Sequence, residues 1–308
     1  MKTSVAAKVK AISTIRNRID ESVAGIDGVI GSMIGLKMTG GILTKRVGIT
    51  YLVRKKVPTK ELPPEQRIPD RLKIDGTWVN VDVIEWPLMR EQAGNSGLIT
   101  FDGRKPGTLS CFATSPNGVF GISCAHCLAG ADGNPSTPSP VSIYQPGRSD
   151  DIASGTSYWS VSAPGPGLPK NFGYLDCGLI AFTPSEAAAL TRNASAIHPV
   201  DDIGSLTGQR VFATNALRSS AGDNFRRTAT IWTVDKVALG ERADVVLLVD
   251  PPGTFIGDSG LLWRTRSGMA VAIHARGELI LGGQGSRLTT AMAVHRARSA
   301  LAVDALLF

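Results

Sequence analysis

Three side chains of this sequence could together carry out nucleophilic catalysis: Ser259, His126 and Asp176. Ser259 lies in the tetrapeptide Gly-Asp-Ser-Gly, between Gly257 and Gly260, a pattern typical of a hydroxyl exposed on a tight turn. A serine hydroxyl is a weak nucleophile at neutral pH, so it needs a nearby base and a third group that orients the base. His126 is the candidate base, and Asp176 is the candidate orienting acid. The order His, Asp, Ser along the chain is one of the orders known for such triads.

Other residues compete for these roles, and the sequence favours them less. His198 lies in a polar loop, and His295 lies in an expected C-terminal helix. Asp150 and Asp151 are rivals for the acid role, in a polar loop that reads Arg-Ser-Asp-Asp. A single histidine usually has only a structural role. The segment around His126, described below, is what sets it apart.

Composition excludes several classes of protein. The chain has 308 residues, of which 43% are hydrophobic and 19% charged, as in ordinary globular proteins. The net charge is +7, but the basic residues form only short clusters and aromatic residues make up 6%. A nucleic-acid platform interleaves basic and stacking aromatic residues, so nucleic acid is not the expected partner. The sequence has no apolar run of about 18 residues and no apolar core of a secretory signal, so we expect no membrane span and a cytoplasmic location.

The elements that must position these residues fall into two parts. Residues 4–24 show helical periodicity, and residues 29–38, 47–53 and 79–84 read as strands. We therefore predict a small α+β module over residues 1–90, with an exit linker around Pro87 to Gly97. Residues 91–308 read as many short strands separated by glycine- and proline-rich turns, and residues 291–307 as a C-terminal helix. The fold class is therefore mainly β.

The segments around the three residues resemble a known family. Gly-Ile-Ser-Cys-Ala-His-Cys, which ends at Cys127, resembles the Thr-Ala-Ala-His-Cys signature of chymotrypsin/trypsin-like serine proteases. Asp176 with Cys-Gly-Leu-Ile resembles the family's Asp-Ile-Ala-Leu-Leu strand, and Gly-Asp-Ser-Gly is its nucleophile motif. The stretch Val271 to His274 resembles the strand that walls the first specificity pocket. The front segment resembles that of intracellular trypsin-like proteins of bacteria.

The resemblance implies a fold, an activity and a set of roles. The fold would be two β-barrels with the triad in the cleft between them, preceded here by the front module. The activity would be peptide-bond hydrolysis through an acyl-enzyme on Ser259, with the N–H groups of Gly257 and Ser259 as the oxyanion hole. The family also has a disulfide from the cysteine after the histidine to one sixteen residues earlier, which would join Cys127 to Cys111.

The first specificity pocket differs from that of trypsin. Gly253 stands six residues before the serine, where trypsin-like enzymes place an aspartate, so cleavage after Lys or Arg is not expected. Thr254 and His274 stand where glutamyl endopeptidases of the family place a threonine and a histidine, which together can bind a carboxylate. The resemblance therefore implies a preference for acidic residues. The alternative is that His274 is simply packed between strands.

Two features remain open on the sequence alone. In secreted members of the family, the aspartate at the place of Asp258 pairs with a new N-terminal amine after activation cleavage, but the Ile-Val-Gly-Gly segment that supplies this amine is absent here at the usual distance. Cys124 and Cys177 are left over from the expected disulfide, and in a cytosolic enzyme we expect them reduced. A zinc site from Cys124, His126 and Cys127 would need a fourth ligand and would consume the base. No cofactor or metal is expected.

The leading hypothesis is a regulated intracellular serine endopeptidase that cuts a protein partner. Residues 1–90 could recognise an activating or inhibiting protein. A second hypothesis is a latent or inactive binding protein on a protease fold, although the intact His126, Asp176 and Ser259 argue against it. A third is a nucleic-acid-associated protein that uses the basic surface, with binding that depends steeply on salt.

Overall fold

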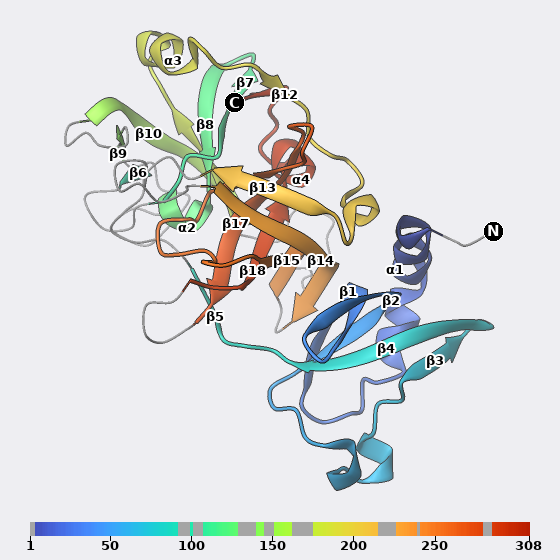
Figure 1. The fold of residues 1–308 in the computed structure, drawn as a ribbon. Helices are drawn as coiled ribbons and strands as arrows, with labels where there is room; N and C mark the ends of the chain where they lie inside the picture. Colours follow the sequence, from blue (N-terminus) through green and yellow to red (C-terminus); the bar gives the residue numbers. More distant parts are fainter. Residues whose placement is uncertain are drawn as a thin grey trace.

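The structure is a computed structural model, and it describes residues 4–91, 99–100, 107–128, 140–144, 151–161, 175–214, 226–238, 241–279 and 285–308. The fold is mainly β, as the sequence predicts, and the strands of the described residues form two sheets. Figure 1 shows the front module, in blue, beside the sheet of the C-terminal half, in orange and red. The second sheet, in green, lies on the other side of that half.

The C-terminal half contains a closed barrel of six strands. Its strands pair in the order β13, β16, β17, β18, β15 and β14, and β14 pairs again with β13 to close the ring. Their bounds are Arg210–Thr214, Leu262–Arg264, Ala270–Glu278, Leu288–Ala293, Glu241–Val249 and Arg226–Ala238. This closed barrel next to a second sheet fits a chymotrypsin-like fold.

The front module continues the sheet of this barrel. Its strands are β1 (Val29–Thr39), β2 (Ile42–Val53), β3 (Arg71–Ile74) and β4 (Thr77–Glu85), and β1 pairs antiparallel with β14. The first half of β14 pairs with β13 and the second half with β1, so this one long strand belongs to both parts. Gly35 of β1 faces Thr233 of β14. A Cβ added to Gly35 would lie 2.4 Å from the Trp232 carbonyl oxygen. Glycine therefore permits the close approach of the two strands.

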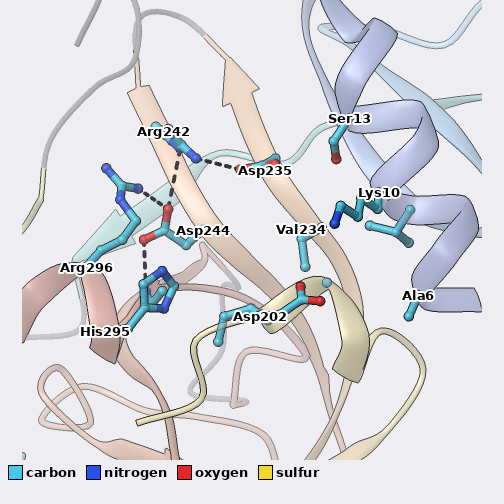
Figure 2. Close-up of a pocket in the computed structure, with 14 residues that line it drawn as sticks. Ala6, Lys10, Ser13, Asp202, Val234, Asp235, Arg242, Asp244, His295 and Arg296 are labelled. Carbon is cyan, nitrogen blue, oxygen red and sulfur yellow. Dashed lines mark hydrogen bonds and ion pairs between the residues drawn. The ribbon is translucent and has the colours of Figure 1, made fainter. Parts of the chain in front are cut away.

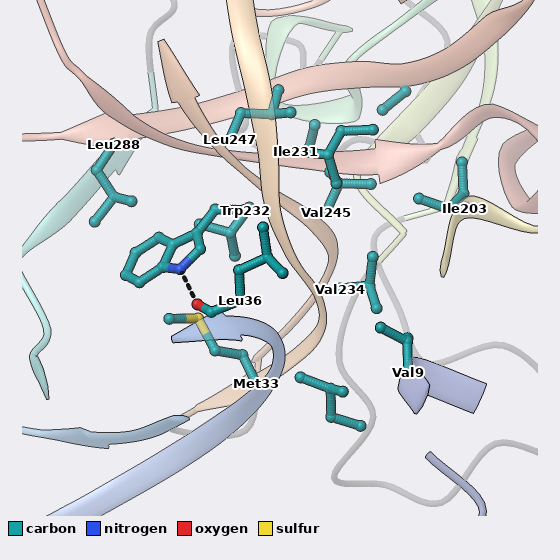
Figure 3. Packing of buried hydrophobic residues seen from close by; sticks show 14 of the residues in the cluster. Val9, Met33, Leu36, Ile203, Ile231, Trp232, Val234, Val245, Leu247 and Leu288 are labelled. Atoms are coloured by element: carbon teal, nitrogen blue, oxygen red, sulfur yellow. Dashed lines mark hydrogen bonds between the residues drawn. The ribbon is translucent and has the colours of Figure 1, made fainter. Parts of the chain in front are cut away.

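A shared core joins the module to the barrel. Figure 3 shows Met33 and Leu36 of β1 packed against residues of β14 and β15, among them Trp232 and Val245. The indole N–H of Trp232 donates to the Leu36 carbonyl at 2.7 Å, which satisfies the polar end of a buried aromatic ring. Because these side chains form one cluster, the module and the barrel bury their apolar surfaces against each other.

The first helix, α1 (Val5–Glu21), confirms the helix predicted from the spacing of apolar residues. Its buried face includes Val9, Ile12 and Ile19, and the Ser4 side chain caps its N-terminus by accepting from the Ala7 N–H. The module also contains two short 3₁₀ turns, η1 (Thr59–Glu61) and η2 (Pro64–Gln66). Among the described residues, no helix is both long and apolar enough to cross a membrane.

The second sheet has the order β12, β19, β7, β8, β11, β10, β9 and β6. Their bounds are Ala196–Ile197, Ala305–Leu307, Cys111–Ser115, Gly118–Ser123, Cys177–Ala181, Asp151–Val161, Pro140–Tyr144 and Ile99–Thr100. The predicted hairpin with its turn at Ser115 to Gly118 is confirmed as β7 and β8. Among the described residues this sheet is an open series of strands, so a second closed barrel is not seen there.

Short helices complete the fold: α2 (Ala125–Leu128), α3 (Pro184–Thr191), η4 (Ile203–Leu206) and α4 (Val294–Ala300). The prediction of one helix over residues 291–307 is wrong in extent. Residues up to Ala293 belong to β18, because they pair with β15 and β17, and residues from Ala305 pair with β7. The expected exit linker also differs, since Met89–Glu91 forms strand β5 against β17. Residues 92–98 lie outside the described part of the chain.

Candidate active site

The structure brings His126, Asp176 and Ser259 together. The Nε2 atom of His126 lies 2.9 Å from the Ser259 hydroxyl, and its Nδ1 atom lies 2.5 Å from one carboxylate oxygen of Asp176. The other carboxylate oxygen accepts the backbone N–H of His126 at 2.9 Å. Asp176 therefore fixes both the backbone and the ring of the histidine, which leaves Nε2 directed at the serine.

Three separate elements supply these residues. His126 lies in α2, just after β8, and Asp176 comes just before β11; the two strands pair, with Gly178 opposite Ser123. Ser259 lies in the turn between β15 and β16 of the barrel. The site therefore forms where the second sheet meets the barrel, and the pairing of β8 with β11 sets the distance between His126 and Asp176.

Contacts from Thr108 hold the turn that carries Ser259. The Thr108 N–H donates to the Ser259 carbonyl at 2.6 Å, and its hydroxyl donates to the Gly257 carbonyl at 2.8 Å. Gly260 has a φ of 95°, and an added Cβ there would lie 1.9 Å from the Thr108 carbonyl oxygen. A side chain at position 260 would therefore push the turn away from the second sheet.

Burial and the neighbouring charges act in opposite directions on the pKa values of Asp176 and His126. Burial raises the pKa of Asp176, but the charge of His126 and its hydrogen bonds outweigh burial and hold this pKa below its usual value. Burial lowers the pKa of His126, but the charges of Cys127 and Asp176 and the hydrogen bond to Asp176 raise it well above its usual value. Asp176 is therefore ionised near neutral pH, and it stabilises a protonated imidazole.

The Ser259 hydroxyl has two acceptors within reach. It lies 3.0 Å from the Ala275 carbonyl oxygen as well as 2.9 Å from His126 Nε2. When His126 is protonated, Nε2 carries a hydrogen, so the hydroxyl donates to Ala275. When His126 loses that proton, Nε2 becomes an acceptor, and the hydroxyl can donate to the base.

This change of hydrogen-bond acceptor with the protonation of His126 predicts how activity depends on pH. Only neutral His126 can accept the serine proton, and its pKa is raised in the folded protein. We therefore expect kcat/KM for a peptide substrate to rise with pH, with a midpoint above the usual histidine pKa of about 6.5. Replacing Cys127 with Ala removes one of the charges that raise this pKa, so the midpoint should move to lower pH. Activity already at its plateau at about pH 6 would contradict the assignment.

The backbone around Gly257 suits an oxyanion hole. Gly257 has a φ of 99°, which favours glycine, and its carbonyl is fixed by the Thr108 hydroxyl. Within the described residues, no backbone carbonyl accepts the Gly257 N–H. The roles of Gly257 and Ser259 as oxyanion donors stay a prediction.

Asp258, whose partner the sequence leaves open, pairs with Arg227 of β14. The Arg227 Nε atom lies 3.6 Å from a carboxylate oxygen of Asp258, and both side chains are almost fully buried. The same oxygen accepts the Phe255 N–H at 2.8 Å, and the Arg227 guanidinium lies 5.4 Å from the centre of the Phe255 ring. A buried arginine thus supplies the counterion of Asp258.

No motif in the sequence marks Arg227, which stands next to Arg226 in one of the short basic clusters. Neighbouring residues of a strand point to opposite faces, so one of two adjacent arginines in β14 must point inward. Arg226 is exposed and lies over the Phe212 ring, while Arg227 is buried. The alternation of side chains along a strand could therefore have shown from the sequence that one of these two arginines is buried.

The expected disulfide between Cys111 and Cys127 is not formed, and all four cysteines are free and buried. The Cys127 thiol lies against Gly107 and forms a hydrogen bond with Cys124, whereas Cys111 lies in β7. Burial raises the pKa of Cys111 to about 12. Burial would also raise the pKa of Cys127, but the Cys124 hydrogen bond and the His126 charge lower it to about 6. Cys127 is thus an electrostatic neighbour of the candidate base.

A metal ion at His126 and Asp176 would compete with the contacts that these residues already make. Ligand atoms of Cys124, His126 and Asp176 lie within 4.8 Å of one another, so Asp176 takes the place that the expected zinc set gave to Cys127. Both ring nitrogens of His126 already contact Asp176 and Ser259. The Cys124 thiol donates to the His274 carbonyl at 3.0 Å. A metal would have to displace these contacts, so the donor set fits a triad better.

The predicted specificity residues are all close to Ser259 in sequence or by hydrogen bonding, but all three are buried. Gly253 has a φ of 88°. The hydroxyl of the next residue, Thr254, donates to the Ser286 carbonyl at 3.4 Å. His274 is fully buried, its ring lies edge-on to Trp263, and burial with the charges of His126 and Arg227 lowers its pKa to about 3. His274 is therefore neutral at physiological pH, and the packing alternative gains support.

The competing candidates fall elsewhere. Asp150 lies outside the described residues, and Asp151 begins β10. His295 lies in α4, where Nδ1 contacts the Val200 carbonyl at 3.1 Å. His198 lies beside Pro199, and its carbonyl accepts the Ala270 N–H at 2.9 Å. Their contacts are thus structural.

A separate cavity of about 400 Å³ lies between α1 and the barrel, and Figure 2 shows its lining. Asp244 accepts from the Ala293 N–H at 2.9 Å and pairs with Arg242 and Arg296. Arg242 also pairs with Asp235 at 2.6 Å. The charges that line this cavity are therefore largely compensated by one another.

Comparisons with known proteins cover different parts of the chain. A family model described as "NARROW LEAF 1 N-terminal domain" matches residues 5–84, which is the front module. No curated protein matches. The matched model spans about a quarter of the chain, so it does not assign a family to the whole protein. The expected likeness of the front segment to bacterial proteases stays a prediction.

Among solved structures, the chain is similar to one described as "Structure of Glu endopeptidase in complex with MPD". The two share 16% identity with a TM-score of 0.38, and the alignment covers 68% of this chain and 93% of that chain. A TM-score this low does not assign a fold. The fold described here follows from the strand pairing of the chain itself.

Proposed function

We propose that this protein is a serine endopeptidase that hydrolyses peptide bonds through Ser259, His126 and Asp176. We also propose that it acts on a protein partner inside the cell, with residues 1–90 as the surface for an activating or inhibiting protein. The four unpaired cysteines support a reducing compartment such as the cytoplasm. Neither a metal nor a cofactor takes part in the proposed reaction.

In the proposed mechanism, neutral His126 takes the Ser259 proton while the serine oxygen attacks the scissile carbonyl. Asp176 keeps the imidazole in the correct tautomer and stabilises the charged ring. The N–H groups of Gly257 and Ser259 bind the oxyanion, where one donor is typically worth about 2.7–4 kcal/mol. His126 then protonates the leaving amine, and water releases the acyl group by the same steps.

One observation carries this proposal. The two ring nitrogens of His126 contact Asp176 at 2.5 Å and Ser259 at 2.9 Å, although the three residues come from separate segments. A structural histidine has no need of a serine on one side and a carboxylate on the other. The contacts match the nucleophile, base and orienting acid of a triad.

A preference for acidic residues before the cleaved bond belongs to the proposal as its least supported part. Thr254 and His274 are the proposed pocket residues together with Gly253, but both side chains are buried and His274 is neutral. A neutral imidazole could still donate one hydrogen bond to a carboxylate. A peptide panel varied at the residue before the cleaved bond tests this preference.

The alternative is a latent or inactive binding protein on the same fold. Ser259 is fully buried and His126 nearly so, which supports latency in the state described here. The two proposals differ in one property, which is whether the Ser259 hydroxyl attacks a reagent that reaches it.

A fluorophosphonate probe separates the two proposals. We expect the probe to label the purified full-length chain and to leave the Ser259→Ala variant unlabelled, since the probe needs an activated serine. Ser267→Ala, at an exposed serine of the turn between β16 and β17, is the matched control and should label like the wild type. Failure to label either the wild type or the control, with both proteins folded, would favour the latent binding protein.

A further inference from the structure

Strand β5 (Met89–Glu91) lies on the edge of β17 that is also bordered by the turn that carries Ser259. β5 pairs antiparallel with the end of β17, with Glu91 opposite Arg276 and Met89 opposite Glu278. The Leu279 N–H also donates to the Leu88 carbonyl at 2.7 Å. The other edge of β17 at these positions is occupied by β18. β5 therefore takes the one edge that β18 leaves open (Figure 1).

The same edge carries β16 further along β17, with Leu262 opposite Ile273. Between β16 and β5, this edge is bordered by the nucleophile turn. The Gly260 N–H donates to the His274 carbonyl at 2.8 Å, and the Ser259 hydroxyl lies 3.0 Å from the Ala275 carbonyl. Along this edge, therefore, β16, the serine and β5 follow one another.

The β5 strand runs along β17 toward Ser259. Because the pairing is antiparallel, the last residue of β5, Glu91, lies opposite Arg276, which is the neighbour of Ala275. An extended peptide adds to a sheet edge through its backbone, and side-chain pockets then give specificity. A peptide whose scissile bond reaches Ser259 in this direction would lie along Arg276 to Glu278, where β5 now lies.

We propose that β5 is an internal substrate-like strand that blocks the cleft, and that it must leave β17 before an extended peptide can bind. The inference rests on the proposed peptidase function and adds its regulation. β5 is only three residues long, and Leu88 just before it is exposed, so this strand can open locally.

The front module anchors the start of this strand. The Trp86 N–H donates to the Val53 carbonyl at 2.9 Å, and the Lys236 amine lies 5.1 Å from the centre of the Trp86 ring. Trp86 is nearly buried, and only Pro87 and Leu88 separate it from β5. A protein that binds the module near Trp86 could therefore pull β5 from the edge.

The register indicates which backbone group to remove. Leu279 and Leu88 form a hydrogen-bonded pair, and such pairs alternate along an antiparallel ladder, so Gly277 and Arg90 form the next one. Proline at position 90 removes the donor, whereas alanine keeps it. Arg90→Pro and Arg90→Ala are therefore matched variants that differ in whether residue 90 can donate its backbone hydrogen bond to Gly277.

We expect Arg90→Pro to hydrolyse fluorescein-labelled casein at least about tenfold faster than the wild type, and Arg90→Ala to match the wild type. Faster amide exchange at Gly277 and Leu279 in Arg90→Pro, with barrel amides still protected, would show that β5 is released in a folded protein. Released β5 with unchanged hydrolysis, while the fluorophosphonate probe still labels Ser259, would overturn the inference and leave the proposed function standing.

A second variant works in the opposite direction. Arg276 and Glu91 form a non-hydrogen-bonded pair, whose spacing suits a disulfide. The double variant Arg276→Cys, Glu91→Cys should lose casein hydrolysis when oxidised and regain the level of Arg276→Cys alone when reduced. Full activity in the oxidised, cross-linked form would overturn the inference.

If the probe labels no variant, the proposed function fails, and binding still tests the edge. In the Ser259→Ala background, a fluorescein-labelled peptide that copies residues 86–91 should bind Arg90→Pro and should not bind Arg90→Ala. Equal binding to both variants, or binding to neither, would overturn the inference without reference to catalysis.

Discussion

Replacing Asp176 with Asn is expected to lower kcat for peptide hydrolysis about 10⁴-fold, with little effect on folding. The amide oxygen of Asn can still accept the His126 N–H that the carboxylate now accepts at 2.9 Å. Its NH₂ group, however, would face Nδ1 and favour the tautomer with hydrogen on Nε2. The imidazole would then point a donor, and not an acceptor, at the Ser259 hydroxyl.

Single-turnover hydrolysis and the rate of fluorophosphonate labelling measure this loss. Asp201→Asn is a suitable control, because Asp201 is an exposed aspartate away from the triad, and it should keep wild-type rates. The carboxylate also raises the pKa of His126, so the pH midpoint of the remaining activity should fall in Asp176→Asn. A variant with nearly full activity would mean that Asp176 does not orient the base.

Removing either partner of the Arg227–Asp258 pair should destabilise the protein by about 3–5 kcal/mol, because each change leaves one charge buried without its counterion. Both side chains are at most 4% exposed and their charged atoms lie 3.6 Å apart. Asp258 also holds the Phe255 N–H and precedes the nucleophile, so Arg227→Met and Asp258→Asn should reduce labelling of Ser259 as well.

Urea unfolding of the two single variants and the double variant measures the coupling. The double variant should be more stable than the sum of the single losses implies, since it removes both charges together. Arg210→Met provides the surface comparison, because Arg210 pairs with Asp250 in an exposed ion pair that should contribute only about 0–1 kcal/mol. Additive losses in the double variant would show that Arg227 and Asp258 act independently.

The sequence predicts that the three candidate triad residues lie together, because each of them lies in a short motif. His126, Asp176 and Ser259 are each marked by their neighbours in the sequence, and in the structure His126 contacts both Asp176 and Ser259. The helix α1 is likewise predictable, since its apolar residues repeat every three or four positions. Such signals need no knowledge of distant pairing.

The features that the sequence could not supply depend on long-range pairing. Arg227 meets Asp258 only because β14 closes the barrel, and β5 meets β17 only because the front module holds Trp86 in place. The cysteine spacing matched a family disulfide, but spacing alone does not fix the direction of the Cys127 thiol. The apolar run before residue 294 read as helix because a buried strand and a buried helix have similar compositions.

The shared strand β14 also bears on how the protein unfolds. Its residues Thr233 to Ala238 would expose a row of unpaired backbone groups if β1 were absent, because β13 covers only the other half. Such an edge invites pairing with another chain. The front module and the barrel therefore form one cooperative unit, in which removal of the first 90 residues would leave an aggregation-prone barrel and not an independent enzyme.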